Sequence, residues 1–120
     1  MRNERKEVKA MFVNLTPHAI NIVDEANQVI RTFVSEGVAR AAQRTELVGE
    51  IDGVRITKSA FGEPVDLPEY RDGVFLIVSL ATVNAARAFG RRVDDLLITN
   101  EAVRDDQGHI IGCRSLGRVD

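Results

Sequence analysis

The run Val74-Phe75-Leu76-Ile77-Val78, followed by Ser79, opens the stretch that decides the fold, which continues to residue 100. An apolar run without polar alternation predicts a strand buried on both faces. The alanine-rich residues 80–89 predict a helix, Gly90 ends it, and residues 96–99 predict a second buried strand. Strand, helix and strand in this order predict a crossover between parallel strands. The carboxyl end of the first strand then becomes a natural place to bind an anion.

Composition predicts one domain without a polyanion partner. The chain has 120 residues, 44% of them hydrophobic, which is enough for one core. We expect residues 11–120 to form the domain and residues 1–10 a flexible or helical tail. Sixteen basic against 18 acidic residues give a net charge of −2, so we expect no extended nucleic acid as partner. A single cysteine, and no apolar run of the roughly 20 residues that a membrane span needs, favour the cytoplasm without membrane contact.

The remaining chain predicts hairpins around this crossover. Residues 19–23 and 29–34 form one, residues 48–51 and 54–57 form another around Asp52-Gly53, and a third returns along residues 109–116. Residues 38–42 fit a helical turn or an edge strand equally. Residues 61–73, rich in glycine and proline, predict an irregular loop that could offer Phe61 or Tyr70 for stacking on a base. The fold class is therefore α+β, a mixed sheet with hairpins and one β-α-β crossover.

Four polar residues are expected on one rim of the sheet. Ser79, where the strand becomes the helix, suits either an N-cap or an anion site. Because the next parallel strand ends nearby, the rim gathers Ser79, Thr82, Thr99 and Asn100.

Two arginines and a histidine complete the candidate ligand-binding set. The last hairpin brings the strands of Arg104 and Arg114 together, and such a pair suits either a phosphate or the carboxylates of Glu101, Asp105 or Asp106. His18, after Thr16-Pro17, fits a polar rim residue or a plain turn residue.

No pattern predicts catalysis or a cofactor. Ser79 lacks the Gly-x-Ser-x-Gly surroundings of a hydrolase nucleophile, and the two histidines and one cysteine form no zinc spacing. Cys113, in an apolar strand, is interpreted as a small core residue. We therefore expect no enzyme, no metal and no cofactor.

Several short motifs resemble a family of small uncharacterised bacteriophage proteins. The motifs are Asn14-Leu15-Thr16-Pro17-His18, Ile77-Val78-Ser79, Val103-Arg104-Asp105 and Gly112-Cys113-Arg114. The resemblance implies an accessory protein in the cytoplasm of an infected bacterium. By analogy of size and setting, it suggests a sponge that sequesters a nucleotide signal of host immunity, such as those of Thoeris and cyclic-oligonucleotide pathways.

Two functions thus compete at this point. The first is a non-catalytic binding protein, expected to be a homo-oligomer, which sequesters a phosphorylated small molecule such as a nucleotide. The alternative is a phage protein-interaction or structural accessory protein that inhibits a host factor, which would present an exposed apolar patch or edge strand.

Overall fold

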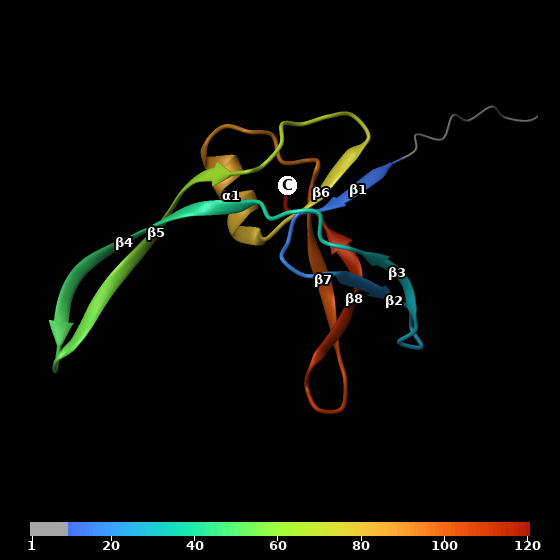
Figure 1. Ribbon diagram of the computed structural model, residues 1–120, viewed down its shortest axis with the longest axis horizontal. Coiled ribbons are helices and arrows are strands. Elements are labelled where there is room, and N and C mark those ends of the chain that lie inside the picture. Colours follow the sequence, from blue (N-terminus) through green and yellow to red (C-terminus); the bar gives the residue numbers. More distant parts are fainter. Residues whose placement is uncertain (1–9) are drawn as a thin grey trace, which may run out of the picture.

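Six strands form one mixed sheet, and two further strands form a separate ribbon. The structure, a computed structural model, describes residues 10–120 (Figure 1), so all but the last residue of the tail expected at residues 1–10 lies outside the described part. The sheet order is β1-β6-β7-β8-β2-β3, and β4 pairs with β5 alone. Strands make up most of the regular structure, with a single helix in the described range, so the α+β class holds in a strand-rich form. No helix within residues 10–120 is long and apolar enough to cross a membrane.

The central crossover confirms the prediction from the apolar run. Strand β6 (Val74–Ile77) leads through α1 (Leu80–Ala88) into β7 (Leu96–Arg104), and β6 pairs parallel with β7. On its other side β6 pairs parallel with β1 (Met11–Asn14), which explains its burial. The helix ends before Gly90, whose φ of 82° is the left-handed conformation that glycine adopts freely.

Two hairpins complete the sheet, as expected. Strand β7 continues antiparallel into β8 (Ile110–Gly117), and β2 (Ile20–Val23) pairs antiparallel with β3 (Val29–Phe33). The two hairpins join where β2 runs parallel to β8. Gly112 allows this close approach, because a Cβ there would lie 2.7 Å from the carbonyl oxygen of Asn21.

The sheet curls until its two outer strands meet. Strands β1 and β3 stand at opposite ends of the sheet order, yet Asn14 bridges to Ser35 just after β3. The Phe12 and Phe33 rings pack with their centroids 5.3 Å apart. The curl therefore gives the sheet a concave face.

One apolar cluster fills each side of the sheet. Helix α1 covers one side, where Val83 and Ala86 pack with Leu76 and Leu96 among other residues. On the concave side, a smaller cluster contains Ile20, Phe33, Ile77 and Cys113, with Phe12, Ile22 and Leu116 partly buried against it. The concave side has no helix over it within residues 10–120, so part of its apolar surface stays open.

The ribbon of β4 (Arg40–Ile51) and β5 (Val54–Val65) projects from the sheet as an arm (Figure 1). Its turn confirms the prediction from Asp52-Gly53, since both residues have positive φ, 53° and 81°. Residues 40–42 belong to β4, which settles the choice between helical turn and strand. The prediction of an irregular loop over residues 61–73 is wrong for residues 61–65, which continue β5. Pro64 fits there because a two-stranded ribbon has open edges that need no N–H donor.

Candidate functional site

The side chains of Ser79 and Thr82 form hydrogen bonds that stabilise the start of α1. The Ser79 Oγ accepts from the Thr82 backbone N–H at 3.2 Å and lies 2.9 Å from the Thr82 Oγ1, which confirms the N-cap. Thr82 is fully buried and donates to the carbonyl oxygen of Ala39 at 3.2 Å. The Thr82 hydroxyl thereby links the helix to the base of the arm, and both hydroxyls already have hydrogen-bond partners within the fold.

The two arginines of the candidate set are held by different turns. Arg104 donates from Nη1 to the carbonyl oxygen of Gly108 at 2.7 Å, within its own hairpin. Arg114 reaches the β2–β3 turn, where it donates to the carbonyl oxygen of Asp24 and, at 3.0 Å, to the Oδ1 of Asn27. Each guanidinium therefore stabilises a turn.

The alternative carboxylate partners of these arginines are also engaged elsewhere. Glu101 accepts from the Ser115 hydroxyl at 2.6 Å, and Asp105 accepts from the backbone amides of Gln107 and His109 at 2.9 Å. Within residues 10–120, neither Arg104 nor Arg114 forms an ion pair with Glu101, Asp105 or Asp106. The two arginines instead donate to backbone carbonyl oxygens and to the side-chain amide of Asn27, and no sequence pattern indicated these partners.

His18, Asn100 and Thr99 lie in three separate surroundings. The side chain of His18 is exposed, and its carbonyl oxygen accepts from Asn14 Nδ2 at 2.8 Å. Asn100 is exposed and lies beside Gly117, where an added Cβ would come within 3.3 Å of its Nδ2. Of the seven candidate residues, only Thr99 lines one of the four main hollows among residues 10–120.

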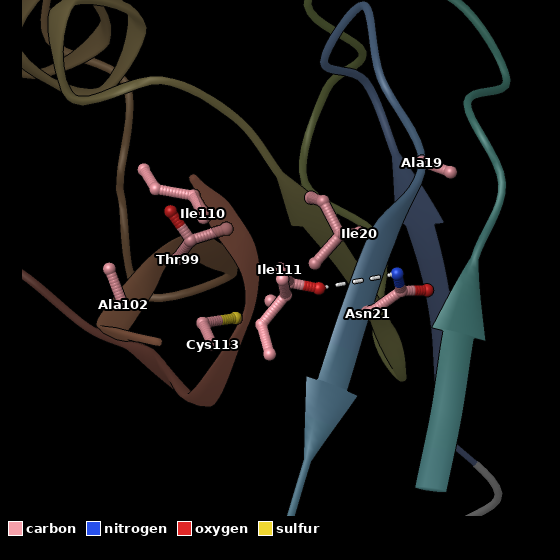
Figure 2. A pocket seen from close by; sticks show the side chains of 9 residues that line it. Ala19, Ile20, Asn21, Thr99, Ala102, Ile110, Ile111 and Cys113 are labelled. Carbon is pink, nitrogen blue, oxygen red and sulfur yellow. Dashed lines mark hydrogen bonds between the residues drawn. The ribbon is translucent and has the colours of Figure 1, made fainter. Parts of the chain in front are cut away.

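The hollow at Thr99 is small and apolar. It measures about 220 Å³ between β2 and the β7–β8 hairpin (Figure 2). Asn21 crosses it to donate to the carbonyl oxygen of Ile111 at 3.4 Å. Cys113 is buried there, and burial raises the pKa of its thiol, which confirms the interpretation of a core cysteine. Ligand pockets usually exceed about 300 Å³, so this hollow is too small for a nucleotide.

A larger groove of about 480 Å³ opens on the concave face of the sheet. Its volume lies within the range of small-molecule sites. Aliphatic and aromatic side chains from five strands and one arginine line most of it, the full set being Phe12, Ile22, Ile30, Arg31, Phe33, Leu97, Ser115 and Leu116. We call this hollow the sheet groove.

Arg31 supplies the charge of the sheet groove. Its guanidinium carbon lies 4.6 Å from the ring centroid of Phe33 and 5.1 Å from that of Phe12, within cation–π range of both. Arg31 is exposed, and within residues 10–120 its guanidinium makes no hydrogen bond and no ion pair. The rings thus hold a guanidinium whose N–H donors face no acceptor among the described residues.

The other polar group of the groove is the Ser115 hydroxyl. Because it donates to Glu101 at 2.6 Å, it can only accept from a ligand. Glu101 has a positive φ of 57°, so the backbone at this end of the groove adopts a conformation uncommon for a residue with a side chain. The groove therefore presents a guanidinium that can donate, a hydroxyl oxygen that can accept and an apolar lining beside them.

Comparisons with family models, curated proteins and solved structures give no match for this chain. The resemblance to small phage proteins therefore stays a prediction. Function has to be inferred from the geometry of the sheet groove and of the arm.

Sequence reasoning missed the groove for an identifiable reason. Arg31 and Phe33 stand two residues apart on a strand, so their shared face could be anticipated. Phe12 joins them only because β1 and β3 meet, which no local pattern indicates. The aromatic ring expected from Tyr70 is instead covered by Arg92, whose guanidinium carbon lies 3.6 Å from the ring centroid. Phe61 lies on the arm.

Proposed function

We propose that this protein is a non-catalytic binding protein that sequesters an anionic small molecule, of the nucleotide class, in the sheet groove. The observation that carries the proposal is Arg31, held over Phe12 and Phe33 at an apolar groove without an acceptor among residues 10–120. A guanidinium on an aromatic surface binds phosphate strongly, because its N–H groups match phosphate oxygens in pairs.

The apolar lining supports a flat heterocycle as the second part of the ligand. Ile22, Leu97 and Leu116 lie in the same groove as Arg31 and offer a surface against which a base can pack. The Ser115 oxygen, whose hydrogen is donated to Glu101, could accept from an exocyclic amine. A nucleotide combines these features: phosphate for Arg31, a flat ring for the apolar lining and a donor for Ser115.

The biological setting extends the proposal by analogy. The motif resemblance to small phage proteins suggests that the ligand is a nucleotide signal of host immunity, and sequestration needs affinity without turnover. The groove lining consists of apolar side chains, one arginine and one serine. We accordingly assign binding to this groove and no reaction.

Calorimetric titration with ADP, ADP-ribose and a cyclic dinucleotide tests the proposal. We expect heat from at least one of these nucleotides. Arg31→Ala should weaken its affinity about ten- to a hundredfold, since loss of a charge-assisted hydrogen bond costs about 1.5–3 kcal/mol. Arg31→Lys keeps the charge but not the paired donors, so its affinity should lie between those of the wild type and Arg31→Ala. Arg71→Ala, an exposed arginine in the loop before β6, is the matched control and should bind as the wild type does.

Two results would contradict the assignment. Equal affinity of wild type and Arg31→Ala would place the ligand elsewhere, and Arg104→Ala and Arg114→Ala would then show whether the originally expected residues bind it. No heat from any nucleotide at high micromolar concentration would remove the nucleotide class. A second candidate function, protein interaction, would then take precedence, because five large apolar side chains of the arm are exposed: Leu47, Val48, Ile51, Val54 and Phe61.

A further inference from the structure

The outer part of the β4–β5 arm projects away from the rest of the described chain (Figure 1). All residues from 43 to 55 are exposed, and the contacts of the arm with α1 are near its base, at Ala39, Phe61 and the neighbouring residues. A two-stranded ribbon is marginal in water on its own, because it has too little apolar surface to bury. Both of its edges also present unpaired backbone N–H and C=O groups. A second surface that covers the ribbon and pairs with one of its edges would stabilise it.

Charge along β4 changes sign from base to tip. Arg40 and Arg44 lie in the half nearest the sheet, and Glu46 and Glu50 lie in the outer half. Within residues 10–120, Arg44, Glu46 and Glu50 form no ion pair within 4.0 Å, and Arg40 reaches only Asp66, at 3.9 Å. On β5, Lys58 stands opposite Glu46 and Arg55 opposite Glu50 in the register, but neither forms an ion pair with its glutamate within 4.0 Å. The strand β4 itself therefore carries a basic half and an acidic half whose charges form no close ion pair within the ribbon.

We propose that a second copy of this chain covers the arm, with the free edge of β4 pairing antiparallel with the same edge of its partner. An antiparallel arrangement sets the basic half of one β4 against the acidic half of the other. A two-fold axis at Thr45 places Arg44 opposite the partner's Glu46, and symmetry makes this contact twice. The two ribbons become one four-stranded antiparallel sheet.

The β4 edge is favoured over the β5 edge by Pro64. Proline has no N–H, so it cannot donate to a further strand at the base of β5. The 12 residues of β4 contain no proline, and antiparallel pairing of two equal arms brings the tip of each to the base of the other. The exposed apolar pair at the tip, Ile51 and Val54, then lies near the partner's arm base rather than in open solvent.

Charge reversal at the arm tests this interface. Light scattering with size-exclusion chromatography should find a dimer of the wild-type full chain. Arg44→Glu and Glu46→Arg should each weaken dimerisation at least tenfold, because each creates two like-charge contacts across the axis. An equimolar mixture of the two variants should form a heterodimer, since every contact across the axis then joins opposite charges. Arg71→Glu, a reversal outside the arm, is the matched control.

The mixing experiment separates this interface from effects within one ribbon. Circular dichroism of each variant checks the fold, and the double variant Arg44→Glu/Glu46→Arg should dimerise again. A wild type that stays monomeric at high micromolar concentration would overturn the proposal. So would two single variants that dimerise like the wild type, or that remain monomeric when mixed although both are folded.

Discussion

Asn14 is the residue whose replacement most directly probes how the sheet closes. Its side chain is fully buried and makes four hydrogen bonds. The Nδ2 donates to the carbonyl oxygens of His18 at 2.8 Å and Phe33 at 2.9 Å. The Oδ1 accepts from the backbone N–H and the hydroxyl of Thr16, at 2.9 and 2.7 Å. These bonds tie the end of β1 to the end of β3, where the curled sheet meets itself.

We expect Asn14→Ala to lower the free energy of unfolding by about 3–5 kcal/mol. Each hydrogen bond contributes roughly 0.5–1.5 kcal/mol net, and a buried group left without a partner costs about 1–3 kcal/mol more. The carbonyl oxygen of Phe33 and the N–H of Thr16 would both lose their partner. For a domain of this size the midpoint of thermal unfolding should fall by about 10–20 °C.

Urea unfolding followed by far-UV circular dichroism measures this effect. Asn84→Ala is the matched control, because Asn84 is exposed on α1 and alanine is the better helix former there. That variant should be unchanged or slightly more stable. A loss below about 1 kcal/mol for Asn14→Ala, or an equal loss in both variants, would refute the view that Asn14 holds the two sheet edges together.

Three further outcomes follow from other parts of the structure. Gly112→Ala should destabilise the protein by about 1–3 kcal/mol, because its Cβ would lie 2.7 Å from the Asn21 carbonyl oxygen, whereas Gly49→Ala, with nothing within 4 Å, should be close to neutral in the same urea assay. Burial raises the pKa of the Cys113 thiol, so the stability contributed by the buried neutral thiol should be complete below the thiol's ordinary pKa and decline as the pH rises above it. A urea series across alkaline pH should show a steeper loss of stability for the wild type than for Cys113→Ala, in which only other groups such as Tyr70, whose pKa is raised by its hydrogen bond with Asp72, still act. In hydrogen exchange, the β6 amides should exchange slowest, since the strand lies between β1 and β7, and rapid exchange there would show that it opens locally.

The sequence predicted the centre of the fold because its signals are local. The apolar run at residues 74–78, the Ser79 cap and the Gly90 stop each act within a few residues, and all three occur as expected. The Asp52-Gly53 turn is equally local. Patterns of this kind depend on backbone geometry and on burial of one face, both of which a short segment specifies.

The sequence could not predict how distant segments meet. The length of the arm was underestimated because Gly62 and Pro64 usually mark loops, and only pairing with β4 keeps them in a strand. Arg114 was expected beside Arg104, but the parallel contact of β2 with β8 brings it to the turn at Asp24. The sheet groove depends on the same long-range closure, since Phe12 and Phe33 come from strands at opposite ends of the sheet order.

Nitrogen-15 NMR titration of the full chain with the nucleotide that gives heat in calorimetry tests the assignment of the sheet groove most directly. Ligand in the groove should shift the amide signals of its lining residues, above all Arg31, Phe33 and Leu116, while the signals of Ser79 and Thr82 at the start of α1 stay in place. Shifts confined to Ser79, Thr82 and Asn100, with Arg31 unaffected, would contradict the assignment of the groove as the binding site.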